Sequence, residues 1–232
     1  MKLEVELLHK EYESVLSGYA ILLSFRMYNL CVKAHPVILL PVVVKVKGTE
    51  QKLEDIAQVG LRAEDQLDIY PSHEDLIVPI GQGIAELHPE LKQSIEAIHV
   101  DEPEPKDFKY LRLTMPEVDK ARHDLLLEGV DAYYEVAKGQ LDVAKVKYVA
   151  RMEKSIFGQP KEEVDVARGM FDETFNQHAE MVEKTVADKQ TEIEEAYQRY
   201  LERRVQQEQS RLEQAAAQGL DVLNQMQMPG LS

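Results

Sequence analysis

Val32-Lys33-Ala34-His35-Pro36 decides the fold of this chain, together with the run that follows it, Val37-Ile38-Leu39-Leu40-Pro41-Val42-Val43-Val44-Lys45-Val46-Lys47-Gly48-Thr49. Apolar residues at helical spacing lead up to Pro36, and the residue before a proline avoids the α region. The run after Pro36 is rich in β-branched residues and ends at a Gly-Thr pair, which predicts a strand and a turn. A long helix therefore passes the chain to a sheet-containing unit at this elbow.

Long helical patterns lie on both sides of that unit. The first covers residues 3–33, where one apolar stripe is formed by Leu8, Tyr12, Val15, Tyr19, Leu22 and Leu30. The second covers residues 117–157. The third begins at Pro160, a residue favoured in the first turn of a helix, and is expected to end at about Leu212.

The middle of the chain, residues 37–108, has the pattern of a compact α/β unit. Alternating or β-branched segments predict strands, and Gly81-Gln82-Gly83 predicts a turn that leads into a helix over residues 84–98. A polar, proline-rich loop is expected next. The predicted strands lie at residues 42–44, 66–70 and 110–113, with a short helix or strand start at residues 53–59 and the loop at residues 101–107.

One helix before the unit and two after it predict an α+β fold: a three-helix bundle with an inserted small, β-rich α/β domain. The predicted parts are residues 1–35 (first helix), 36–109 (inserted domain), 110–205 (second and third helices) and 206–232 (C-terminal tail). The chain crosses between the two bodies twice, and we expect a hinge at these crossings. The hinge residues are His35 and Pro36 in the first crossing, and Asp107 and Lys109 in the second.

Composition narrows the class of protein. The formal net charge of −15 argues against a protein that chiefly wraps nucleic acid, although it leaves room for a local basic patch. Cys31 stands alone, which excludes an internal disulfide, and we expect it to be a small buried residue. The apolar run at residues 37–46 is far shorter than the ~20 residues that span a membrane.

No catalytic pattern is present in the sequence. No spacing places two of the seven histidines on one helix face, and Gly81-Gln82-Gly83 lacks the other residues of a phosphate-binding loop. We therefore expect no enzyme activity, no cofactor, no metal site and no small-molecule substrate.

Basic residues on the second long helix are the strongest candidates for a binding site. Lys147, Arg151 and Lys154 follow i, i+4, i+7 spacing on one side, and Lys138 and Lys145 lie seven residues apart on another. Such rows can contact RNA phosphates. The alternative is a solvated helix face whose charges pair with Glu135, Asp142 and Glu153.

Several segments, in order and spacing, resemble the ribosome recycling factor family over about residues 8–200. Lys33-Ala34-His35-Pro36 resembles the family's Arg-Ala-Ser-Pro, and residues 39–49 resemble its next strand, which also ends in Gly-Thr. Residues 53–59 are similar to Leu-x-x-Leu-Ala-x-Val. Residues 118–125 are similar to Thr-x-Glu-x-Arg-x-x-Leu, and residues 182–193 to the family's closing helix.

The resemblance implies an L-shaped pair of domains and a mechanical role in translation. Family members bind between the ribosomal subunits after termination; the bundle grips large-subunit RNA, and a translocase GTPase drives the small domain to split the subunits. The implied partners are thus the large subunit, its RNA and proteins, and that GTPase, with no membrane. The implied RNA-binding residues are Lys33, Lys138, Lys145, Lys147, Arg151 and Lys154.

An alternative is a degenerate recycling-factor homologue kept as a structural subunit of an organellar (mitochondrial) ribosome or another large organellar assembly. Lys33 replaces the family's arginine, the second helix carries fewer basic residues, and a tail is added. Lysine does not reproduce the two-pronged hydrogen bonding of arginine. We expect the mitochondrial matrix, with the chloroplast stroma or bacterial cytoplasm as alternatives.

Overall fold

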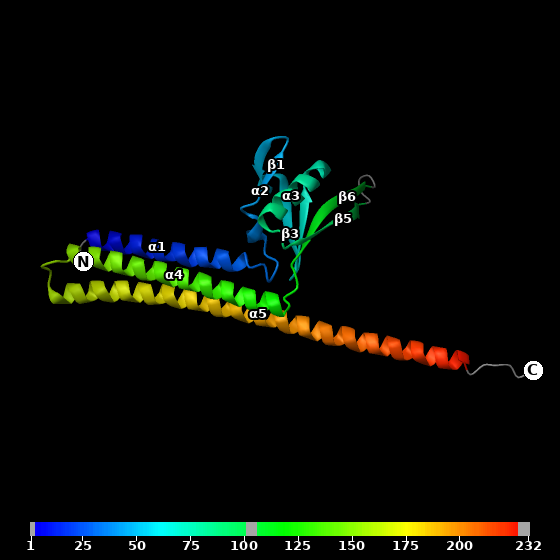
Figure 1. The fold of residues 1–232 in the computed structure, drawn as a ribbon. Coiled ribbons are helices and arrows are strands. Elements are labelled where there is room, and N and C mark those ends of the chain that lie inside the picture. The colour runs from blue at the N-terminus through cyan, green and yellow to red at the C-terminus, as the bar shows by residue number, and fades with distance from the viewer. Residues whose placement is uncertain (1–2, 101–105, 227–232) are drawn as a thin grey trace, which may run out of the picture.

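The computed structural model describes residues 3–100 and 106–226, which form a long helical rod and a small sheet domain beside it (Figure 1). Three helices lie along one another in the rod: α1 (Leu3–Tyr28), α4 (Lys120–Ser155) and α5 (Lys161–Met226). This confirms the predicted three-helix bundle with an inserted domain. Among the described residues, no helix has both the length and the apolar character that crossing a membrane requires.

The rod is held together by one apolar core. Its centre is an aromatic stack in which the ring of Tyr12 on α1 lies 5.2 Å from that of Phe171 on α5, at an interplanar angle of 13°. Tyr148 of α4 lies 5.3 Å from the same Tyr12 ring, so all three helices meet there. The helix α4 starts at Asp119, whose side chain accepts a hydrogen bond from the Arg122 backbone N–H at 2.8 Å.

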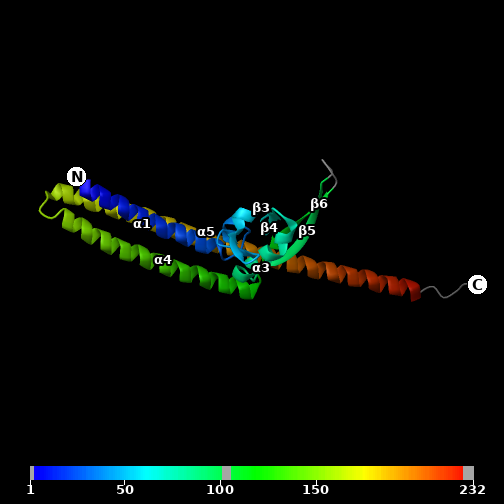
Figure 2. The ribbon, with the colours of Figure 1, turned by 90° about the horizontal axis from the view of Figure 1, so that it is seen from above.

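The helix α5 is much longer than its two partners. It continues past the sheet domain as a single projecting helix (Figure 2). The predictions that this helix ends at about Leu212 and that a tail begins at residue 206 are wrong, because the helix continues to Met226. Residues 227–232 of the predicted tail lie outside the described part of the chain. The segment after residue 200 is rich in Gln, Glu, Arg and Ala, which are good helix formers even without packing.

The sheet domain contains two antiparallel sheets and short helices. A β1–β2 hairpin forms one sheet, and the other has the strand order β3-β4-β6-β5. The elements are η1 (Pro36–Leu39), β1 (Val43–Val46), β2 (Thr49–Lys52), α2 (Leu53–Ile56), β3 (Ala57–Ala63), β4 (Gln66–Pro71), η2 (Glu74–Leu76), α3 (Ile77–Leu87), β5 (Lys92–Val100) and β6 (Lys106–Thr114).

The prediction of a helix over residues 84–98 is wrong. The helix α3 starts earlier and ends at Leu87, and the following residues form β5, which pairs along its whole length with β6. The prediction of a turn at Gly81-Gln82-Gly83 is also wrong, because all three residues lie within α3. A Cβ on Gly83 would lie 2.8 Å from the Val43 carbonyl oxygen, so glycine is needed there for the close approach of α3 to β1.

The rod and the sheet domain have separate hydrophobic cores. In the first connector, after α1, Val32 belongs to the rod core and Ala34 to the sheet core. In the second connector, before α4, Met115 belongs to the sheet core and Val118 to the rod core. The two bodies are therefore joined at residues 31–34, where Cys31 and Ala34 lie in the sheet core and Val32 lies in the rod core, and at residues 115–118. The boundary expected at residue 109 is wrong, since β6 continues to Thr114.

Candidate functional site

The row Lys147, Arg151 and Lys154 lies where α4 contacts α1. Arg151 Nη1 donates to Glu11 Oε1 of α1 at 3.1 Å, and the pair holds the pKa of Glu11 below its usual value. The Lys147 Nζ atom lies 5.2 Å from the centre of the Tyr148 ring, and Lys154 lines a small groove with Arg151. The structure thus brings these three side chains to one flank of α4, as their spacing predicts.

The second row lies on the other flank of α4. Lys145 Nζ lies 3.1 Å from Asp172 Oδ1 of α5 and 4.2 Å from the centre of the Phe175 ring. The nearest aromatic partner of Lys138 is Tyr134, whose ring centre lies 5.8 Å from its Nζ. Lys145 therefore contacts α5, whereas Arg151 contacts α1.

Near the start of α4, Lys120 pairs with Asp124 of the same helix at 2.6 Å, whereas the charges farther along α4 pair with other helices. Arg151 and Lys145 pair with α1 and α5, and Glu153 pairs with Arg168 of α5 at 3.0 Å. The predicted pairs with Glu135, Asp142 and Glu153 are not found among the described residues. Within that same part of the chain, the exposed Lys138, Lys147 and Lys154 have no carboxylate within 4.0 Å. They are the cations of α4 that an anionic partner could reach.

The outward side of α4 carries exposed apolar side chains among exposed acidic ones such as Glu135 and Asp142. Four apolar side chains on this side are exposed, although the same residue types usually lie in a core. They are Leu125 (68% exposed), Val136 (46%), Val143 (69%) and Val146 (73%).

The first connector is held from several sides. The predicted hinge residue His35 accepts a hydrogen bond from the Val37 N–H at 3.2 Å, and its ring stacks on Tyr28 at 4.2 Å. Pro36 starts η1. The predicted RNA-binding residue Lys33 is half-buried, with its Nζ 3.7 Å from Glu195 Oε2 of α5. These positions agree with a crossing at residues 32–36, while the hinge and RNA-binding roles stay predictions.

Arg122 is a junction residue that sequence reasoning missed. Its Nη2 atom donates to the carbonyl oxygens of Leu30 and Cys31, both at 3.3 Å, and burial lowers its pKa. It therefore fixes the start of the first connector to the start of α4. The only sequence signal was its place three residues after the Asp119 cap, a position that also matches an arginine of the family pattern.

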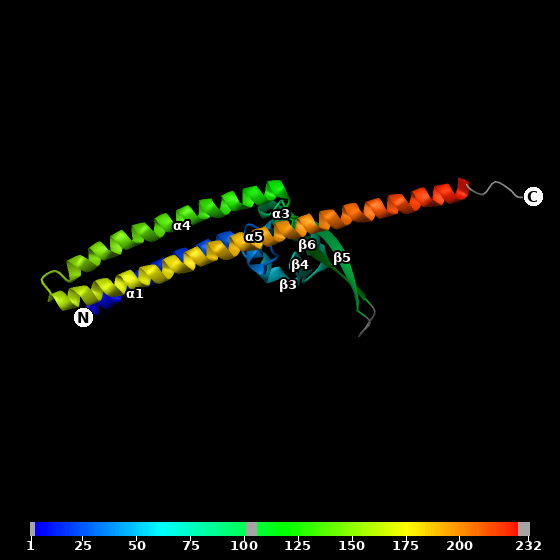
Figure 3. The ribbon, with the colours of Figure 1, turned by 90° about the horizontal axis from the view of Figure 1, so that it is seen from below.

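Asp107 and Lys109 do not lie at the second crossing. Both are in β6, where Asp107 Oδ1 lies 2.6 Å from His99 Nδ1 and Lys109 Nζ lies 3.6 Å from Glu74 Oε2. The hairpin of β5 and β6 projects away from the rod (Figure 3). Their prediction as hinge residues is wrong, because strand pairing carries β6 on to Thr114 before the chain turns back to the rod.

The helix α5 contributes side chains to the real second crossing. Arg203 Nη1 lies 3.3 Å from Glu117 Oε1 in the second connector, and Arg199 Nη2 lies 4.0 Å from Glu64 Oε2 in the sheet domain. These residues line a cleft of about 350 Å³ between the rod and the sheet domain. The junction is thus formed by three segments, the two connectors and α5.

Comparison with known proteins identifies this arrangement. A solution structure of the ribosome recycling factor has a TM-score of 0.64 at 16% identity, and the match covers 84% of this chain and 100% of that one. Models of the T. thermophilus ribosome recycling factor and E. coli elongation factor G bound to the E. coli post-termination complex give a TM-score of 0.49 at 16% identity. That match covers 82% of this chain and 98% of the other. No curated protein matches. The family model for ribosome recycling factor matches residues 27–193, which is most of the chain, so the chain belongs to the ribosome recycling factor family.

Proposed function

We propose that the chain acts in translation as a recycling factor, binding the large ribosomal subunit through its rod and helping to split post-termination ribosomes. The observation that carries the proposal is the division into two bodies with separate cores, which the chain connects at residues 31–34 and 115–118 and which also meet along α5. Such a division suits a mechanical role, in which one body is anchored while a translocase GTPase moves the other.

The anchoring surface in this proposal is the flank of α4 that carries Lys147 and Lys154. Both are exposed and, in the described part of the chain, unpaired with a carboxylate. They can therefore approach RNA phosphates without first breaking an ion pair. Arg151, between them, is held toward Glu11 and Tyr148. Lys138, Lys145 and Lys33 complete the proposed RNA contacts, with Lys145 and Lys33 first releasing Asp172 and Glu195.

The first experiment measures binding of the purified protein to large ribosomal subunits by sedimentation over a range of salt concentrations. Lys147→Glu/Lys154→Glu is compared with Lys161→Glu/Lys184→Glu, a matched change of charge at exposed positions on α5. Each lost phosphate contact should reduce the slope of log affinity against log salt by about one, so we expect the α4 variant to lose about two. Equal slopes in both variants would contradict the proposed surface.

The second experiment measures activity. Post-termination ribosomes are mixed with the protein, translocase and GTP, and subunit separation is followed by light scattering. We expect splitting that depends on all three components and fails with the α4 variant. Binding without splitting would leave the anchoring role in place and remove the recycling role.

One observation favours a second candidate function, a permanent structural subunit of an organellar ribosome. The exposed face of α4 formed by Leu125, Val136, Val143 and Val146 suits a protein partner better than RNA. This candidate expects stoichiometric co-purification that persists at high salt. Replacing Val143 and Val146 by Ser should then release the protein from the assembly, whereas a salt-labile free pool favours the exchanging factor.

For localisation we propose the mitochondrial matrix, with the chloroplast stroma or bacterial cytoplasm as alternatives. The support is the replacement of the family's motif arginine by Lys33 and the small number of basic residues on α4. Fractionation of cells that express the native protein, with protease protection of sealed organelles, separates these locations.

A further inference from the structure

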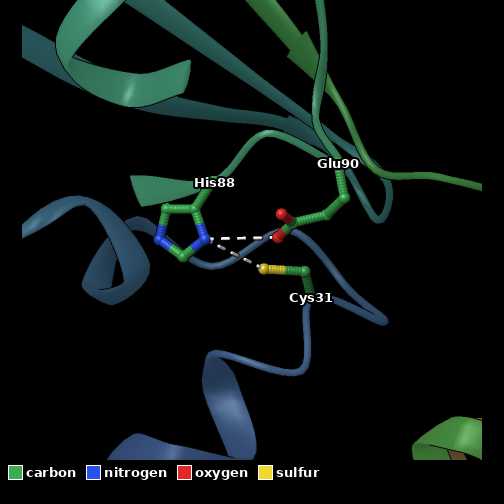
Figure 4. A group of neighbouring side chains, drawn as sticks. All are labelled: Cys31, His88 and Glu90. Carbon is green, nitrogen blue, oxygen red and sulfur yellow. Dashed lines mark hydrogen bonds and ion pairs between the residues drawn. The ribbon is translucent and has the colours of Figure 1, made fainter. Parts of the chain in front are cut away.

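Three metal-ligating side chains converge beside the first connector. Cys31 comes from the connector itself, His88 from the end of α3, and Glu90 from the loop before β5 (Figure 4). Each residue offers one donor atom, and the three atoms all lie within 4.8 Å of one another. They are the Cys31 Sγ, a ring nitrogen of His88 and a carboxylate oxygen of Glu90. Cys31 and His88 are buried and Glu90 is exposed, so the group has one side open to solvent.

The imidazole of His88 is held in the orientation that a metal ligand needs. Its ring is 5% exposed, and Nε2 lies 3.0 Å from the carbonyl oxygen of Ile38. A carbonyl can only accept, so Nε2 carries a hydrogen and donates. A backbone carbonyl that fixes the far nitrogen of the ring is the usual outer partner of a metal-bound histidine. The other nitrogen, Nδ1, therefore points at Cys31 and Glu90.

All three atoms that face the centre of the group are electron-rich. Nδ1 lies 3.2 Å from Glu90 Oε1 and 3.8 Å from Cys31 Sγ. When the ring is neutral, the Nδ1 lone pair meets the Glu90 carboxylate with no hydrogen between them, and either a proton on Nδ1 or a metal cation at the centre relieves this arrangement. A cation there is bound by nitrogen, sulfur and oxygen together, which is a donor set that zinc accepts.

The distances fit a single tetrahedral ion. Zinc binds sulfur at about 2.3 Å and nitrogen or oxygen at about 2.0–2.1 Å, so tetrahedral angles place sulfur and nitrogen about 3.6 Å apart and nitrogen and oxygen about 3.3 Å apart. The observed separations are 3.8 Å and 3.2 Å. These two separations are within a few tenths of an ångström of the tetrahedral values, and the third, from the Cys31 sulfur to a Glu90 oxygen, is at most 4.8 Å.

We propose that Cys31, His88 and Glu90 bind one Zn²⁺ ion, with a water molecule as the fourth ligand on the exposed side. On binding, the thiol proton of Cys31 is released to solvent and a zinc–sulfur bond forms, with no change of oxidation state. The thiolate, the carboxylate and the ion then sum to zero charge, which lowers the cost of placing them in a mostly buried site. The ligand is the thiolate, so binding of the ion itself drives the loss of the thiol proton.

The site lies at the first connector, so a bound ion would affect the junction between the rod and the sheet domain. Cys31 lies in the first connector after α1, is itself buried in the sheet core beside Val32 of the rod core, and has a left-handed backbone φ of 51°. His88 and Glu90 belong to the sheet domain. A bound ion would therefore fasten the first connector to the sheet domain and restrict the junction on that side. Zinc binding itself does not depend on the proposed role in translation.

The test uses the full chain, treated with a chelator, dialysed and titrated with zinc in competition with a chromophoric indicator. We expect one zinc per chain. Cys31→Ser and Glu90→Gln should weaken the affinity at least about 100-fold, since loss of a mere outer partner already costs 10–100-fold. Glu86→Gln is the control, because Glu86 is exposed on α3 and pairs with Lys45. It should leave the affinity unchanged.

A second readout identifies the ligand atom. Cobalt(II) in place of zinc should give the ultraviolet absorption of sulfur-to-cobalt charge transfer in the unaltered chain and in Glu86→Gln, but not in Cys31→Ser. Circular dichroism checks that each variant is folded, and Glu90→Gln decides the matter if Cys31→Ser does not fold, since Glu90 is exposed. Absence of stoichiometric binding, or equal affinity in Glu90→Gln and Glu86→Gln, would overturn the proposal.

Discussion

Arg203 on α5 lies 3.3 Å from Glu117 in the second connector, so the rod directly contacts the segment that returns the chain from the sheet domain. Arg199, one turn earlier, reaches Glu64 of the sheet domain at 4.0 Å. Lys33 and Glu195 link the first connector to the same helix at 3.7 Å. Each pair is substantially exposed and contributes little alone. Together they connect α5 to both connectors and to the sheet domain.

We expect Arg199→Glu/Arg203→Glu to loosen the junction, because both reversals place like charges opposite each other. The measurement is a distance distribution between spin labels, one on the rod and one on the sheet domain. It should broaden in the variant, and high salt should broaden the unaltered chain toward it. Arg204→Glu/Arg211→Glu is the matched control on the same helix, at exposed positions. Equal distributions in both double variants would contradict this role.

The aromatic stack of the rod predicts a large effect on stability. Phe171 is 1% exposed and stacks on Tyr12, so Phe171→Ala leaves a cavity and should lower the free energy of unfolding by about 3–5 kcal/mol. Phe157→Ala is the control, since Phe157 is 89% exposed in the turn after α4 and should change stability by less than about 0.5 kcal/mol. Chemical denaturation measures both. A small effect at Phe171 would mean that the rod core is not packed as described.

The rod could be predicted from the sequence and much of the sheet domain could not, for one physical reason. A long helix repeats its pattern over many turns, so α4 and the first half of α5 are visible locally. The residues of β5 carry apolar side chains at spacings that suit either a helix or a strand. Pairing with β6, which itself pairs with the distant strand β4, decides for the strand.

The residues of the candidate site also differ in whether a local pattern or a contact between separate segments determines their position. The two basic rows of α4 follow from helical spacing alone, which is local. Asp107 and Lys109 were misplaced because the end of β6 depends on its partner strands. Cys31 and His88 are 57 residues apart and meet only in the folded sheet domain. The sequence therefore predicted no metal site, since the short spacings that identify one are absent.

His123 predicts a pH dependence of stability. It lies between α4 and α5, with Nδ1 3.0 Å from Asp124 Oδ1 and Nε2 3.0 Å from Glu194 Oε2. The hydrogen bond to Asp124, supported by that to Glu194, raises the pKa of His123 above 6.5, while burial and, to a smaller extent, Lys120 oppose the shift. A raised pKa in the folded state means that the protonated ring stabilises the fold. This contribution is complete below pH 6.5 and is lost as the pH rises through the folded-state pKa.

The measurement is the melting temperature of the unaltered chain and of His123→Gln between about pH 6 and about pH 8. The difference between them should be largest at the acidic end and shrink toward the alkaline end. His73→Gln is the control, because His73 is exposed in the sheet domain. A difference that grows with pH would reverse the sign and contradict the proposed pairing.

The projecting part of α5 predicts two different results of truncation. The last buried apolar residue of the rod core is Ala196, and residues 201–216 are all exposed. A chain that ends at Gln206 keeps Arg199 and Arg203, so its melting temperature and its distribution of interdomain distances should match those of the full chain. A chain that ends at Gln198 lacks both arginines and should keep the rod but broaden the distances. If the longer truncate already melts at a lower temperature, the projecting helix contributes contacts to the fold beyond the two junction ion pairs.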